Sequence, residues 1–256
     1  MLDGGKFVFY TVSDEDHSST RDAVGVAENT GTPTQPVWND LGLIAASYDE
    51  TLLTPRCKDP SVLWDGKKLW MVFGSHGGGV YATELRFVDN PRTLKLAVAP
   101  DKPHTREPGL EGRFTKLAQH MNSDGDESEI EAPFVFRHEE WYYLFTNFGK
   151  CCGGVKSTYS FTIVGRATEV TGPYHDNDGK LLLEGGGTSF LRTEGRFIGP
   201  GHAGIAMIKD GRYVFTYTFS DGRDQGRSKL GVRELKWSAA GWPLLGDHLV
   251  EQPPYD

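Results

Sequence analysis

Short apolar runs separated by polar turns recur along the whole chain. One example is the stretch from Ile130, where an apolar run crosses a polar turn at residues 137–140 and continues into the aromatic run 141–145. Short runs rich in β-branched and aromatic residues, bounded by turn residues, predict antiparallel strands. Helical periodicity is weak throughout. The pattern therefore predicts an all-β protein.

A polar residue stands before the first apolar run in three similar repeats. These residues are Asp59, Glu131 and His202, and each is followed by two apolar runs joined by a turn. Aligning Phe73 with Phe145 also aligns Asp59 with Glu131. We therefore predict that the three polar residues occupy one structural position.

The spacing of the repeats predicts a β-propeller. Repeats of about sixty to seventy residues, each with several short strands, are typical of this fold, in which one repeat forms one blade. The first strand of each blade lines the central channel, so Asp59, Glu131 and His202 are expected to meet near one end of it. Residues 1–256 are predicted to form a single propeller domain. Its blade segments are expected at about residues 1–50, 57–120, 130–195 and 199–250.

Composition excludes several classes of function. The chain has 38% hydrophobic and 24% charged residues, as in a soluble globular domain, and no apolar stretch long enough to cross a membrane. A formal charge of -8 without a basic cluster argues against nucleic acid as a partner. The glycines at 185–187 precede neither a helical pattern nor a Lys-Ser/Thr pair, so no nucleotide or other organic cofactor is expected.

The three cysteines, Cys57, Cys151 and Cys152, lack the spacing of zinc ligands. The adjacent pair permits a vicinal disulfide, but two reduced, buried thiols are the favoured interpretation. Cys152 is interpreted as a packing residue rather than a nucleophile, because no positively charged partner is evident.

Asp59 and Glu131 suggest acid–base chemistry. Two carboxyl groups beside aromatic residues suit hydrolysis of a glycosidic bond, in which one protonates the leaving oxygen. A proton donor needs a pKa raised by burial or by a neighbouring negative charge, and Asp59 beside Glu131 would supply that charge. A carboxylate before proline also commonly caps a turn, so spacing alone leaves both interpretations open.

Further motifs are more specific. The chain contains, in order, Asp59-Pro-Ser-Val, Glu131-Ala-Pro, Cys151-Cys152-x-Gly, Thr171-Gly-Pro-Tyr and Gly199-Pro-Gly-His. Together they resemble the arabinanases of glycoside hydrolase family 43 over essentially the whole chain. The resemblance implies a five-bladed propeller, with about four blades in this chain, that cleaves α-1,5-linked L-arabinan with inversion.

The resemblance also implies roles for individual residues. Glu131 is similar to the general acid, and Asp59 to the carboxylate that orients the acid and raises its pKa. His202 is similar to a histidine near a central calcium or other ion. Ser75 and His76 resemble a substrate-lining loop of the family. Asn147 and Phe148, at the end of a channel-facing strand, are also expected to contact the substrate. The expected substrate-binding residues are Ser75, His76, Asn147 and Phe148.

The catalytic base of the family has no match here. In the family it is an Asp on the first blade, and this chain opens with a run that resembles the second strand of a repeat, so the missing part is expected upstream of Met1. Asp14, Asp16 and Asp22, in the loop after that run, are weak candidates for the base. Three explanations of the missing blade remain open: a shortened homologue, an incomplete N-terminus, or a ring completed by another chain. The third explanation predicts a homo-oligomer.

Two classes of function remain. The first is a glycoside hydrolase acting on arabinan, with arabinofuranosidase or xylosidase activity as a less favoured variant. The second is a non-catalytic propeller that binds arabinose-containing glycans. Because such polysaccharides lie outside cells, a secreted protein is expected, although no signal peptide is visible.

Overall fold

The structure is a computed structural model, and it confirms the all-β prediction. It describes residues 6–13, 22–47, 55–75, 78–88, 93–96, 114–120, 129–149, 151–157 and 161–249. In these ranges the helical elements are two 3-10 turns, η2 (Gly154–Lys156) and η3 (Leu182–Glu184). Neither is long enough to cross a lipid bilayer.

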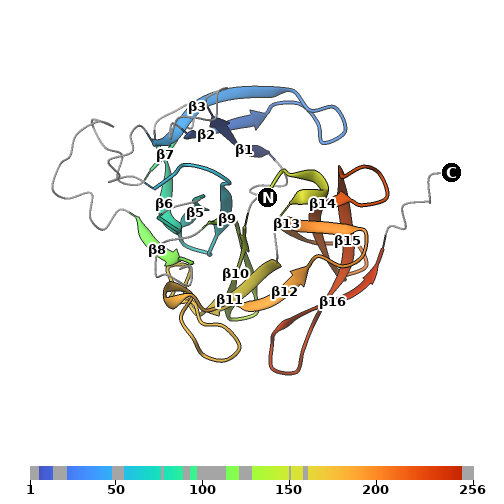
Figure 1. The fold of residues 1–256 in the computed structure, drawn as a ribbon. Helices are drawn as coiled ribbons and strands as arrows, with labels where there is room; N and C mark the ends of the chain where they lie inside the picture. Colours follow the sequence, from blue (N-terminus) through green and yellow to red (C-terminus); the bar gives the residue numbers. More distant parts are fainter. Residues whose placement is uncertain are drawn as a thin grey trace.

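Four antiparallel sheets surround one central axis as the blades of a propeller (Figure 1). Blade 1 consists of β1 (Phe7–Ser13), β2 (Asp22–Asn29) and β3 (Trp38–Ser47). Blade 2 consists of β4 (Ser61–Trp64), β5 (Leu69–Phe73), β6 (Val80–Val88), β7 (Thr93–Leu96) and β8 (Thr115–Ala118). Blade 3 consists of β9 (Ile130–His138), β10 (Trp141–Phe148), β11 (Phe161–Ala167) and β12 (Thr188–Arg192). Blade 4 consists of β13 (Phe197–Met207), β14 (Tyr213–Asp221), β15 (Arg227–Trp237) and β16 (Pro243–His248).

Local turn chemistry explains where the first two strands of a blade are joined. In blade 2, the Asp65 carboxylate accepts the backbone N–H groups of Lys67 and Lys68, both at 2.7 Å. Gly66 follows with a φ of 104°, which glycine adopts without steric cost. In blade 4, Asp210 and the glycine after it form a similar turn. The Asp-Gly pairs thus fix the ends of strands that the apolar pattern predicts.

The core lies between the blades. Three buried clusters are present among the described residues, and each fills the space between two neighbouring sheets. Burial of large apolar side chains is the main term that holds such sheets together. Representative members are Val24, Met71 and Phe73 for blades 1 and 2, Val72, Ile130 and Leu144 for blades 2 and 3, and Phe145, Phe215 and Tyr217 for blades 3 and 4.

The backbone identifies equivalent positions in the blades. Asp59, Ala132 and His202 lie at the start of the inner strands and share a left-handed conformation, with φ of 53°, 52° and 54°. This conformation is uncommon for residues other than glycine, so its recurrence marks one structural position. The prediction that Asp59 and His202 are equivalent is confirmed. The prediction for Glu131 is wrong by one residue, because Ala132 occupies the shared position.

The wrong register came from aligning Phe73 with Phe145. The strand pairs of β4–β5 recur 73 residues later in β9–β10, so Phe73 corresponds to Thr146. A slip of one residue moves a side chain to the other face of a sheet. Phe73 accordingly packs between blades 1 and 2, whereas Phe145 packs between blades 3 and 4.

Candidate active site

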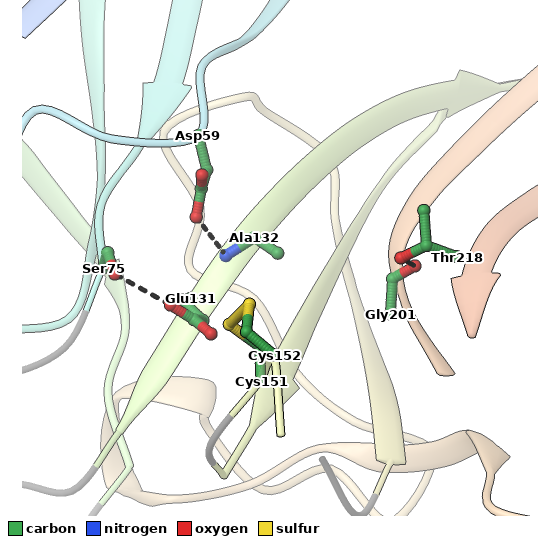
Figure 2. The surroundings of a disulfide bond; sticks show 8 residues. All are labelled: Asp59, Ser75, Glu131, Ala132, Cys151, Cys152, Gly201 and Thr218. Atoms are coloured by element: carbon green, nitrogen blue, oxygen red, sulfur yellow. Dashed lines mark hydrogen bonds between the residues drawn. A yellow bond between two sulfur atoms is a disulfide. The ribbon is translucent and has the colours of Figure 1, made fainter. Parts of the chain in front are cut away.

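Backbone hydrogen bonds between successive blades position the candidate acidic residues. The N–H of Asp59 donates to Thr11 Oγ1 of β1 at 3.1 Å. The N–H of Ala132 donates to Asp59 Oδ2 at 3.2 Å, as Figure 2 shows. Each left-handed residue therefore binds a polar side chain of the preceding blade, and this fixes the site at the inner ends of the blades.

Asn147 continues this series from blade 3 to blade 4. Its Oδ1 accepts the N–H of His202 at 3.2 Å, and its Nδ2 donates to Pro200 O at 3.0 Å and to Thr162 Oγ1 at 3.1 Å. Asn147 is completely buried. The structure thus gives Asn147 an interblade role, and its predicted contact with a sugar stays a prediction.

Glu131 is a buried carboxylate with a hydrogen-bond donor from the preceding blade. It is 5% exposed, and Ser75 Oγ donates to its Oε2 at 2.9 Å (Figure 2). Ser75, which follows β5, is itself buried. A buried charged group requires such a partner, because desolvation otherwise costs several kcal/mol. Blade 2 therefore holds the side chain of Glu131 in place.

Asp59 is electrostatically linked to both other predicted site residues. Burial raises the pKa of Asp59, and the negative charge of Glu131 raises it further. His202, the Ala132 N–H and Lys58 act in the opposite direction without cancelling the effect on this pKa. Asp59, Glu131 and His202 thus come together as predicted, even though Glu131 is offset by one backbone position.

The adjacent cysteines form a disulfide, so the prediction of two reduced, buried thiols is wrong. Cys151 and Cys152 are bonded to each other, and Cys152 is exposed with a φ of 65°. A turn in the left-handed region brings the neighbouring sulfur atoms within bonding distance. Cys57 is the free, buried cysteine, and burial raises the pKa of its thiol to about 12.

Comparison with known proteins decides the family. The family model for glycosyl hydrolases family 43 matches residues 3–243. The chain belongs to this family. Its fold also resembles that of a Cellvibrio cellulosa α-L-arabinanase complexed with arabinohexaose. The TM-score is 0.75 at 29% identity, and the match covers 93% of this chain and 72% of that one.

Two relatives of known name are similar to this family 43 chain over most of its length. It is 31% identical to an extracellular exo-α-(1→5)-L-arabinofuranosidase of Cellvibrio japonicus, over 94% of this chain and 66% of the relative. It is 32% identical to an extracellular endo-α-(1→5)-L-arabinanase of Bacillus subtilis, over 94% and 65%. The chain thus spans about two thirds of the length of these relatives.

Asp22 is committed to ion pairs in this family 43 propeller. It is 2% exposed, and its carboxylate lies 2.9 Å from Arg56 Nη2 and 3.4 Å from Lys58 Nζ. Ser13 Oγ also donates to it at 2.7 Å. These contacts tie blade 1 to the segment that leads into blade 2. They give Asp22 a structural role, while Asp14 and Asp16 lie outside the described residues.

The remaining predicted residues differ in their surroundings. Phe148 is buried in the cluster between blades 2 and 3, with its ring 4.0 Å from that of His120. His76 lies outside the described residues. No group of three or more His, Cys, Asp or Glu side chains that would suit a metal ion occurs in the described ranges. His202 is exposed, and the predicted ion near it stays a prediction.

Sequence reasoning missed the contacts that place these groups. Thr11 was not singled out, although it lies near the end of a run of the same kind as the one that contains Asn147. Both side chains accept the N–H of a left-handed residue from the next blade. A polar residue recurring near the end of the second strand is the signal that would have identified Thr11.

Proposed function

We propose that this chain is the propeller of a glycoside hydrolase that cleaves α-1,5-linked L-arabinan by inversion. Glu131 is the general acid, and Asp59 orients it and modulates its proton affinity. The observation that supports this assignment is the buried Glu131 carboxylate, which is held by Ser75 beside an Asp59 of raised pKa. Relatives named as arabinanases support arabinan as the substrate.

The proposed reaction begins with proton transfer from Glu131 to the glycosidic oxygen. Burial and the negative charge of Glu131 raise the pKa of Asp59, so Asp59 releases its proton less readily than a free carboxyl group does. Loss of the leaving sugar develops positive charge at the anomeric carbon, which water attacks from the opposite face. In an inverting site, a base lies roughly 6.5–9.5 Å from the acid to leave room for that water.

The base is proposed to lie outside the described residues. Within them, Asp22 is engaged by Arg56 and Lys58, and no third acidic group joins Asp59 and Glu131 in a cluster. The same observation favours a second candidate function, a propeller that binds arabinose-containing glycans without cleaving them.

The biological setting follows from the substrate. Arabinan is a polysaccharide outside the cell, and both relatives compared above are named as extracellular. We therefore propose that the protein is secreted. A homo-oligomer that completes the ring, and an ion near His202, stay predictions that gel filtration with light scattering and elemental analysis would test.

Hydrolysis of debranched arabinan tests the leading proposal. We expect Glu131→Gln to lower kcat by about 100-fold or more, the usual contribution of a positioned general acid. Glu84→Gln is the matched control, because Glu84 pairs with Lys68 on the exposed side of blade 2. Equal activity of Glu131→Gln and wild type would refute the assignment. Absence of hydrolysis in wild type, with arabinan still bound, would support the glycan-binding alternative.

A further inference from the structure

The Cys151–Cys152 disulfide is a surface feature that neither interblade packing nor the proposed proton transfer uses. It lies in the turn between β10 and η2, with Cys152 exposed and Cys151 partly exposed. Neither residue belongs to the three buried clusters between the blades. The disulfide is therefore an apolar group that solvent can reach.

This surface lies at the candidate active site. Figure 2 shows the disulfide with Asp59 and Glu131 on one side and with Gly201 and Thr218 on the other. The acidic pair belongs to blades 2 and 3, whereas Gly201 and Thr218 belong to blade 4. The disulfide thus lies among the inner ends of three blades, where a ligand near Glu131 would meet it.

The turn that carries the disulfide is braced against blade 4. η2 packs against β13 and β14. The backbone of Gly226 approaches so closely that a Cβ atom there would lie 2.7 Å from the nitrogen of Val155. Such an approach excludes any side chain at Gly226. The position of the disulfide is therefore fixed from two blades.

The chemistry of the surroundings suggests what this surface binds. The other groups drawn around it are mainly polar: two carboxylates, the Ser75 hydroxyl and the Thr218 hydroxyl. A sugar ring has hydroxyl groups that suit such partners and a C–H face that suits polarisable sulfur. We propose that the Cys151–Cys152 disulfide is the apolar contact surface for a sugar ring bound beside Glu131. This inference rests on the proposed function.

Two double variants distinguish contact from simple stiffening of the turn. Cys151→Ala with Cys152→Ala and Cys151→Ser with Cys152→Ser both remove the cross-link, but only the second makes the surface polar. Calorimetry with a linear α-1,5-arabino-oligosaccharide, in a Glu131→Gln background that prevents cleavage, measures Kd. We expect the serine variant to bind roughly fivefold more weakly and the alanine variant to lose less, as expected for a small apolar area. Equal losses, or none, would overturn the proposal.

Reduction of the disulfide provides an independent measurement. A phosphine reductant converts the disulfide to two thiols and is itself oxidised to the phosphine oxide, with one water molecule supplying the oxygen and both thiol protons. We expect it to weaken binding by the protein that retains both cysteines and to leave the alanine variant unchanged. Val155→Ser is the matched control, since Val155 is 53% exposed on the same turn, and it should bind as its parent does.

The result also separates failure of this inference from failure of the proposed function. If the folded wild-type protein binds no arabino-oligosaccharide, the proposed function is wrong and the inference falls with it. If wild type binds and neither variant nor reductant changes Kd, only the role of the disulfide is wrong. Thermal melting of every variant confirms that the comparison is made between folded proteins.

Discussion

At the scale of single residues, burial and neighbouring charges give Asp59 and Asp221 opposite responses to pH. The pKa of Asp59 is raised, first by burial and also by Glu131. For Asp221, burial alone would raise the pKa, but the Arg223 N–H and the Lys229 and Arg196 charges lower it overall. Ionisation therefore weakens the folded state at Asp59 and strengthens it at Asp221.

Urea unfolding at a series of pH values tests both signs. In a window that begins at about pH 4, the unfolded chain releases the proton of Asp59 before the folded protein does. We therefore expect Asp59→Asn to gain stability relative to wild type as the pH rises through this window. Asp221→Asn should be less stable than wild type at pH 7, with a difference that shrinks as the pH falls below about 4. A difference for Asp59→Asn that does not vary with pH would contradict the assignment.

At the scale of elements, an arginine between two tryptophans joins blades 3 and 4. The guanidinium carbon of Arg166 in β11 lies 4.3 Å from the ring centre of Trp141 and 4.5 Å from that of Trp242. Its Nη1 donates to Ala240 O at 2.7 Å. A planar guanidinium stacks and donates at once, which an ammonium group does not. This contact therefore connects the start of β10 to the turn before β16.

Arg166→Lys should destabilise the protein by about 1–3 kcal/mol, because both stacking contacts and the bond to Ala240 depend on the guanidinium plane. Thermal unfolding would show this as a fall in Tm of roughly 2–4 °C for each kcal/mol. Arg212→Lys is the control, since Arg212 pairs with Asp210 in an exposed turn. Equal Tm values for the two variants would contradict the role of the stacked arginine.

The sequence predicted elements better than the contacts between them. Apolar runs and the polar turns between them are local signals, so the strands of blades 2, 3 and 4 could be predicted from them. The position of Arg166 could not, because Trp141 and Trp242 are brought together only by the packing of two blades. Glu131 was only partly predictable. Its proximity to Asp59 followed from the repeat, but its backbone position is offset by one residue, which depends on which side chains of β5 and β10 face the preceding blade.

At the scale of the whole molecule, the blades differ in how many neighbours stabilise them. Blade 3 shares one buried cluster with blade 2 and another with blade 4, whereas blade 1 shares one cluster, with blade 2, in the described part of the chain. The ion pairs of Asp22 with Arg56 and Lys58 add to this single contact. Local opening is easiest where the fewest buried contacts must be broken. Blade 1 should therefore open more readily than blade 3.

Hydrogen exchange followed by mass spectrometry tests this order. We expect amides of β9 and β10 to exchange more slowly than those of β1 and β2 in the wild-type protein. Asp22→Asn leaves Arg56 and Lys58 without their buried partner, which should cost less than the about 3–5 kcal/mol of a fully buried pair, because both cations are partly exposed. Exchange should then accelerate in β1–β3 while β13–β16 stay unchanged, and Asp221→Asn should show the reverse. A uniform acceleration in all four blades would mean instead that the propeller opens as one cooperative unit.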